Sequence, residues 1–107
     1  MMQPYSCDQV RQLLAQGAQL VDVRSPMEFM QGALPEARNI PVQALGGAAD
    51  TLDPARPVLV YCHSGQRSAY ARMALQSMGF GAVHDLGAGA FYVECLEQQP
   101  AGETAAA

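Results

Sequence analysis

Residues 58–75 read VLVYCHSGQRSAYARMAL and contain the strongest strand signal in the chain. It begins with a continuous apolar run rich in β-branched side chains, which predicts a strand buried on both faces. After Cys62 the pattern changes to a short polar loop containing Gly65, and from Arg67 to helical spacing. Strands without a polar face are typical of parallel sheets, which bind ligands at the carboxyl ends of their strands. The sequence therefore predicts an α/β fold and places Cys62 where a functional site is expected.

The rest of the chain alternates between helical and strand patterns. Ser25, Pro26 and Glu28 supply a capping serine, a proline at the first helical position and the reciprocal glutamate of a capping box. The expected elements are helices over 7–16, 26–31, 67–78 and 90–99, a weak helix within 42–52, turns over 32–41, and strands over 19–23, 58–62 and 82–86. This order predicts a small, mainly parallel sheet flanked by helices. We expect one domain over residues 1–97 and a flexible C-terminal tail over 98–107.

Composition excludes several classes of function. The 107-residue chain has a net charge of −4, and its six basic residues are all arginines, scattered along the sequence. No basic patch for nucleic acid or anionic membrane results, and no apolar run reaches transmembrane length. The three cysteines are Cys7, Cys62 and Cys95, an odd number with wide spacing that fits neither a disulfide framework nor a metal site. The prediction is free thiols, no metal or cofactor, and a cytoplasmic location.

The loop after Cys62 has the chemistry of an anion site. Successive backbone N–H groups in a tight turn form a concave cradle, to which the helix N-terminus adds partial positive charge. Arg67 contributes a full positive charge. A free thiol has a pKa of about 8.5, and such surroundings lower it to roughly 3.5–7.5. Cys62 is therefore predicted to be a reactive thiolate, whereas Cys7 and Cys95, each in an expected helix, are interpreted as structural.

Four segments make the chain similar to the rhodanese family of sulfurtransferases, from about Ser6 to Leu96. These segments are VDVRSPMEF at 21–29, RNIP at 38–41, VLVYCHSGQRSAYARMAL at 58–75 and LGAGAF at 86–91. The resemblance implies a parallel sheet wrapped by helices, which agrees with the expectation from the residues alone. It also implies ping-pong transfer of sulfane sulfur.

The resemblance further implies a role for each residue of the loop. Cys62 would attack the outer sulfur of thiosulfate or a related small anionic donor and hold a persulfide. Cyanide, a small thiol or a protein thiol would then accept the sulfur. Arg67 would help to bind the anionic donor. The residues whose backbone N–H groups would cradle the persulfide are His63, Ser64, Gly65, Gln66, Arg67 and Ser68.

The chain departs from the family pattern near this loop. Where the family often has GHIPGA, residues 32–37 read GALPEA, so Ala33 replaces the histidine and Glu36 the second glycine. Phe91 stands where a tryptophan is usual. None of these positions is the nucleophile, so we expect them to affect packing and substrate preference rather than the reaction.

Two residues at the end of the first expected strand should support the loop after Cys62 without taking part in the reaction. Asp22 is expected to accept hydrogen bonds from the loop backbone or from Arg67. Arg24 is expected to form a structural ion pair, with Glu28 as the candidate four residues on. Neighbouring side chains in a tight loop point apart, so His63 should point away from Cys62 and expose its ring at the mouth of the site. It should then influence selectivity rather than act as the general base.

Two alternatives to a sulfurtransferase stay open. A cysteine phosphatase or arsenate reductase also uses a cysteine–arginine loop, but with five intervening residues, whereas here only His63, Ser64, Gly65 and Gln66 intervene. The shorter loop favours a pocket for one sulfur atom. A non-catalytic rhodanese-like binding module is the other alternative, although such modules usually lack the cysteine.

Overall fold

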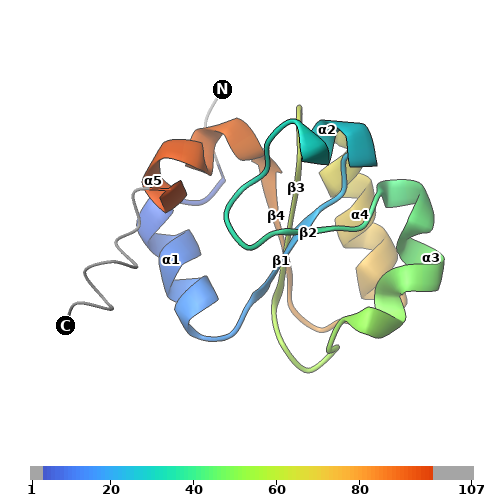
Figure 1. Ribbon diagram of the computed structural model, residues 1–107. Helices are drawn as coiled ribbons and strands as arrows, with labels where there is room; N and C mark the ends of the chain where they lie inside the picture. The colour runs from blue at the N-terminus through green and yellow to red at the C-terminus, as the bar shows by residue number, and fades with distance from the viewer. Residues whose placement is uncertain (1–3, 98–107) are drawn as a thin grey trace.

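The computed structural model describes residues 4–97, and four parallel strands form one sheet in the order β2-β1-β3-β4. The strands are β1 (Gln19–Asp22), β2 (Arg38–Asn39), β3 (Val58–Cys62) and β4 (Val83–Ala88). The sheet runs through the middle of the molecule, with helices on either side (Figure 1). The predicted α/β fold with a parallel sheet is confirmed.

The helices form two layers around the sheet. They are α1 (Cys7–Ala15), α2 (Pro26–Met30), α3 (Leu45–Ala48), α4 (Gln66–Ser77) and α5 (Val93–Glu97), with short 3-10 helices η1 (Val42–Ala44), η2 (Ala49–Thr51) and η3 (Gly89–Tyr92). Helices α1 and α5 lie on one side of the sheet and α3 and α4 on the other (Figure 1). Within residues 4–97, no helix combines the length and apolar character needed to cross a membrane.

Strand β3 joins the two layers because its side chains alternate between two hydrophobic cores. Val58, Val60 and Cys62 belong to the core shared with α3 and α4. Leu59 and Tyr61 belong to the core shared with α1 and α5. All five residues of the strand are buried. The prediction of a strand with no polar face is therefore confirmed.

The site lies at the topological switch point of the sheet, where the order in which strands are added reverses. From β1 the chain first builds outward to β2, then crosses back so that β3 and β4 lie on the other side of β1. In open parallel sheets, the crevice at such a switch point is the usual ligand site. The segments after Asp22 in β1 and after Cys62 in β3 meet there.

Three differences from the predicted elements concern short segments. Strand β2 was not predicted, because Arg38–Asn39 becomes a strand only by pairing with β1. Strand β4 runs on to Ala88, past a register shift in its pairing with β3. The helix expected over 90–99 is partly 3-10 helix, and α5 covers only Val93–Glu97. The expected tail over 98–107 lies outside the described residues.

A disulfide between Cys7 and Cys95 corrects the prediction of free thiols. It joins α1 to α5 across 88 positions of sequence, with the Cα atoms 6.2 Å apart. Both cysteines do lie in helices, and only Cys62 is a free cysteine in the described part of the chain. The prediction failed because wide spacing says nothing about which helices the fold brings together. The inference of a reducing compartment rested on free thiols and loses that support.

We expect the double variant Cys7→Ser/Cys95→Ser to be less stable than the wild type by about 2–5 kcal/mol, because the disulfide closes a long loop in the unfolded chain. Urea unfolding under non-reducing conditions would measure the difference. Adding a reductant should lower the wild-type midpoint towards that of the variant and leave the variant unchanged. Equal midpoints without reductant would contradict the expectation.

Candidate active site

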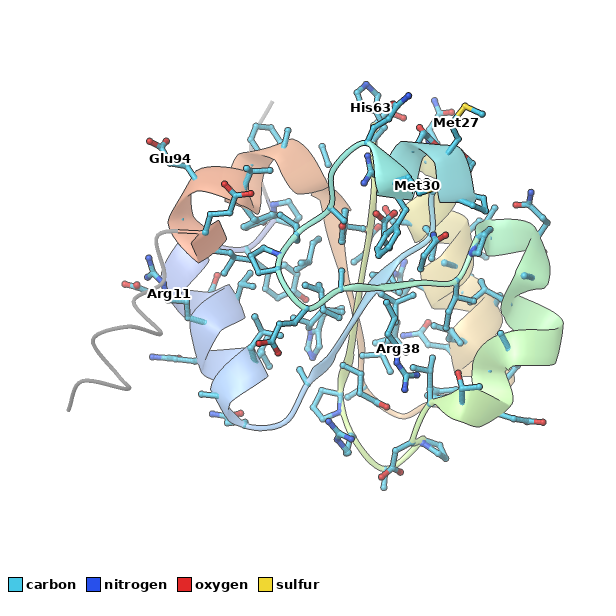
Figure 2. All side chains as sticks on the ribbon, viewed as in Figure 1. Arg11, Met27, Met30, Arg38, His63 and Glu94 are labelled. Atoms are coloured by element: carbon cyan, nitrogen blue, oxygen red, sulfur yellow. A yellow bond between two sulfur atoms is a disulfide. The ribbon has the colours of Figure 1, made fainter. Side chains whose placement is uncertain are left out.

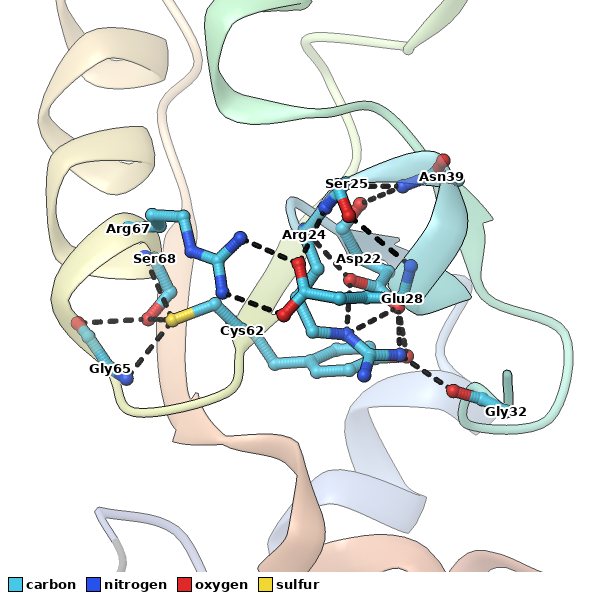
Figure 3. A network of polar contacts seen from close by, with 11 residues as sticks. Asp22, Arg24, Ser25, Glu28, Gly32, Asn39, Cys62, Gly65, Arg67 and Ser68 are labelled. Atoms are coloured by element: carbon cyan, nitrogen blue, oxygen red, sulfur yellow. Dashed lines mark hydrogen bonds and ion pairs between the residues drawn. The ribbon is translucent and has the colours of Figure 1, made fainter. Parts of the chain in front are cut away.

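The Cys62 thiol lies inside the turn between β3 and α4. Its Sγ accepts hydrogen bonds from the backbone N–H groups of Gly65 at 3.0 Å and Ser68 at 3.4 Å, and lies 3.6 Å from the Ser68 hydroxyl (Figure 3). Gly65 caps α4 with a φ of 99°, a left-handed conformation that costs glycine little. The turn therefore directs the N-terminal N–H groups of α4 at the sulfur.

This environment favours the thiolate form of Cys62. Burial raises the pKa of the thiol, but hydrogen bonds from the Ser68 hydroxyl and from the backbone N–H groups of Ser68, Gly65 and Ser64 together lower it by more. The net pKa of Cys62 lies below its ordinary value of 9.0. A thiolate so held is a ready nucleophile, because it is the charged form that attacks.

We expect Ser68→Ala to raise the pKa of Cys62, because the substitution removes the hydroxyl that stabilises the thiolate. The thiolate fraction grows as pH rises through the pKa, so a raised pKa moves the reactivity curve to higher pH. The rate of Cys62 alkylation by iodoacetamide, measured against pH, would show a midpoint at higher pH than in the wild type. Ser77→Ala, on the exposed far end of α4, serves as the control and should leave the curve in place.

Arg67 forms an ion pair that the sequence did not predict. Its Nη1 and Nη2 donate to Oε1 and Oε2 of Glu28, at 2.8 and 3.1 Å, which joins α4 to α2 (Figure 3). The Arg67 guanidinium is the main cause that lowers the pKa of Glu28 to about 2. The only local signal of Glu28 was its place in the α2 capping box, which the structure confirms.

Asp22 organises a second network at the end of β1. The carboxylate is fully buried and accepts hydrogen bonds from the backbone N–H, Nε and Nη2 of Arg24 and from the Tyr61 hydroxyl. Tyr61 in turn accepts a hydrogen bond from the Leu34 backbone N–H, and burial raises the pKa of Tyr61 to about 12. This network ties β1, β3 and the segment after α2 together beneath the site.

The expected partners of these residues were wrong, although their location was right. Asp22 receives its hydrogen bonds from Arg24 and Tyr61, and none is recorded from Arg67 or the Cys62 loop within residues 4–97. Arg24 pairs with Asp22 rather than with Glu28. The pairing of Arg67 with Glu28 is set by the approach of α2 to α4, which spacing along the chain does not reveal.

A pocket of about 260 Å³ opens beside the site. Cys62, His63 and Arg24 line it, together with apolar side chains that include Leu34 and Val93. His63 is exposed, as predicted, and stands at the edge of the molecule (Figure 2). Its expected effect on selectivity stays a prediction.

The three departures from the family pattern differ in their surroundings. Ala33 is one of the residues that line the Cys62 pocket, so the shorter side chain leaves space there. Glu36 has a φ of 65°, the left-handed conformation that favours glycine, and so keeps the backbone of the glycine it replaces. Phe91 is 42% exposed and is not part of the packed core.

Within residues 4–97, no group of three or more His, Cys, Asp or Glu side chains could hold a metal ion. What the site does present is a thiol whose pKa is lowered, backbone N–H donors that converge on its sulfur, and a small pocket. A parallel α/β protein with a cysteine nucleophile at a helix N-terminus can carry a group on sulfur. This combination of a parallel α/β fold and a cysteine turn defines the class to which the protein belongs.

Comparison with known proteins agrees with that class. Residues 6–91 match the family of rhodanese-like domains. A sulfurtransferase of Allochromatium vinosum is 37% identical over 70 residues, 65% of this chain and 65% of that protein. The thiosulfate sulfurtransferase GlpE of Pseudomonas aeruginosa is 34% identical over 82 residues, 77% of this chain and 74% of that protein. The human single-domain sulfurtransferase TSTD1 superposes with a TM-score of 0.70 at 31% identity, over 88% of this chain and 97% of that chain.

The chain therefore belongs to the rhodanese-like domain family, as its sequence predicted. It spans just under two thirds of the Allochromatium protein and about three quarters of GlpE. GlpE is a homologue.

Proposed function

We propose that the protein is a sulfurtransferase that carries sulfane sulfur on Cys62. The thiolate attacks the outer sulfur of the donor, a Cys62 S–S bond forms, and the bond between the two sulfur atoms of the donor breaks. With thiosulfate, the bonding electron pair leaves with sulfite. In the second half-reaction, cyanide or a thiol attacks the outer sulfur of the persulfide, and the Cys62 thiolate is regenerated.

The hydrogen bonds to Sγ are the observation that carries this proposal. The backbone N–H groups of Gly65 and Ser68 already converge on the sulfur, and the family resemblance assigns the same task to the residues from His63 to Ser68. A persulfide places one more sulfur atom in this cradle, where the N–H groups would stabilise its negative charge. GlpE, a named thiosulfate sulfurtransferase, makes thiosulfate the first donor to test.

The two alternative functions fit the site less well. A phosphatase cradle must supply donors to several oxygens, whereas this turn is one residue shorter and surrounds a single sulfur position. A non-catalytic module has no need of a thiol whose pKa is lowered by convergent hydrogen bonds. Donor binding by Arg67, a protein-thiol acceptor and a cytoplasmic location stay predictions.

Intact mass spectrometry after incubation with excess thiosulfate tests the proposal. We expect the protein to gain the mass of one sulfur atom and to lose it on addition of cyanide, with thiocyanate as the product. A protein that gains no sulfur from thiosulfate or from an organic persulfide would contradict the proposed function. A phosphatase substrate would be the next assay in that case.

A further inference from the structure

Arg67, the cation nearest in sequence to the Cys62 loop, is already occupied. Both of its terminal nitrogens donate to the Glu28 carboxylate, and the two side chains are 37% and 33% exposed. The hydrogen bonds to Glu28 are the main cause that raises the pKa of Arg67. The negative charge of the Cys62 thiolate raises this pKa further. A carboxylate therefore stands beside the cation that an anionic donor would need.

Glu28 is held in this place from two sides. Its Oε1 accepts a hydrogen bond from the Ser25 backbone N–H at 2.9 Å, as part of the capping box of α2, and its own backbone N–H donates to the Ser25 hydroxyl. The carboxylate cannot leave Arg67 without also giving up its hydrogen bond to the end of α2. Glu28 is thus a fixed negative charge.

The other cation at the site is neutralised as well. Arg24 lines the Cys62 pocket, but its Nε and Nη2 are bound to the buried carboxylate of Asp22. The remaining charged residue on the wall of that pocket is Glu97, an acid. Around a nucleophile that is itself negative, the described side chains offer no cation without an acidic partner.

We propose that Glu28 sets the donor selectivity of this enzyme by competing with anionic donors for Arg67. The preferred donor is a persulfide whose reacting form, R–S–SH, is uncharged, and the thiosulfate dianion reacts more slowly. This inference rests on the proposed function, since it concerns the sulfur donor of the same site. Glu28 is a selectivity-determining residue and takes no part in bond making.

The two donors differ in charge but not in the bond that breaks. With R–S–SH, the Cys62 thiolate attacks the terminal sulfur, the S–S bond of the donor breaks, and R–S⁻ leaves with the bonding pair while the proton stays on the new Cys62 persulfide. With thiosulfate, the same attack releases the sulfite dianion. Only the second reaction brings a dianion up to the Glu28 carboxylate.

The variant Glu28→Gln tests the inference, because glutamine keeps the capping box but removes the charge. We expect its rate of Cys62 sulfuration by thiosulfate to rise about 2- to 5-fold, the range for a partly exposed charge, and the rise to shrink at high salt. The rate with 2-hydroxyethyl hydropersulfide should change less than about twofold. Alkylation by iodoacetamide, an uncharged reagent, corrects both rates for any change in the thiolate itself.

Glu94→Gln is the matched control. It removes the same charge from an exposed position on α5, away from His63 (Figure 2), and should leave the ratio of the two donor rates unchanged. Arg67→Gln should lower the thiosulfate rate and remove the effect of Glu28→Gln in the double variant. An unchanged or lower thiosulfate rate in Glu28→Gln would overturn the inference.

Protection by inorganic sulfate separates this inference from the proposed function. Sulfate bound at the loop should slow alkylation of Cys62, and we expect Glu28→Gln to bind it about 2- to 5-fold more tightly than the wild type. If no donor transfers sulfur but sulfate protection improves, the proposed function fails while exclusion of anions by Glu28 holds. If sulfate protects the wild type and Glu28→Gln equally, the inference fails whatever the rates with the two donors are.

Discussion

Replacing Cys62 by serine is expected to abolish sulfur transfer. The hydroxyl of serine is not ionised near neutral pH and is a far weaker nucleophile, so no persulfide can form. Serine has nearly the same shape, and the buried site should retain its fold. Intact mass spectrometry with thiosulfate or an organic persulfide should show no added sulfur on Cys62→Ser, and the steady-state assay should show no thiocyanate above the uncatalysed rate.

The disulfide provides the control for this experiment. Cys7 and Cys95 are bonded to each other, so they should take up no sulfur while the disulfide is intact. The variant Cys7→Ser/Cys95→Ser should still gain one sulfur atom, and circular dichroism should confirm that each variant is folded. Sulfur on Cys62→Ser under non-reducing conditions would show that another group carries it and would remove Cys62 from the mechanism.

Replacing Asp22 by alanine is expected to destabilise the fold by about 3–5 kcal/mol, the cost of leaving the other member of a buried ion pair unpaired. Asp22 has no exposed surface, and the Arg24 side chain that would lose its partner is only 15% exposed. The Tyr61 hydroxyl would lose its acceptor at the same time. Urea unfolding followed by circular dichroism would measure the loss.

Asp50→Ala is the comparison for this prediction, since Asp50 is exposed and its substitution should change stability by less than about 0.5 kcal/mol. The loss of stability in Asp22→Asn should fall between those of Asp22→Ala and Asp50→Ala. The amide oxygen of asparagine still accepts a hydrogen bond, but the charge is lost. A loss below about 1 kcal/mol for Asp22→Ala would mean that water or rearrangement compensates the network. The supporting role of Asp22 beneath the site would then be withdrawn.

The elements predicted correctly from sequence are those with strong local signals. The apolar run of β3 has to be buried wherever it lies, and the capping box of α2 satisfies its own backbone N–H groups. The end of β3 at Cys62 and the start of α4 at Gln66 follow from a change of pattern within a few residues. The same short segment contains Cys62 and Gly65, which the structure places together in the turn.

The errors concern contacts between distant segments. Strand β2 exists because β1 offers it hydrogen-bond partners, and the Cys7–Cys95 bond exists because α1 and α5 pack side by side. Neither the pairing of β2 with β1 nor the disulfide can be predicted from the residues that flank it in the sequence. The partner of Arg24 was predicted wrongly for a related reason: Glu28 is paired with Arg67 of the distant helix α4, and Arg24 pairs with Asp22.

The residues alone were enough to predict the parallel α/β architecture and the position of Cys62 at the carboxyl end of a buried strand, whereas anion binding by the turn that follows stays a prediction. Periodicity, capping and turn chemistry act over a few residues, so they can be read in order along the chain. It takes the folded structure to show that Glu28 meets Arg67, 39 positions away, and that Asp22 meets Tyr61. Side-chain contacts of this kind depend on how helices and strands approach each other in space, so they cannot be predicted from short-range patterns along the chain.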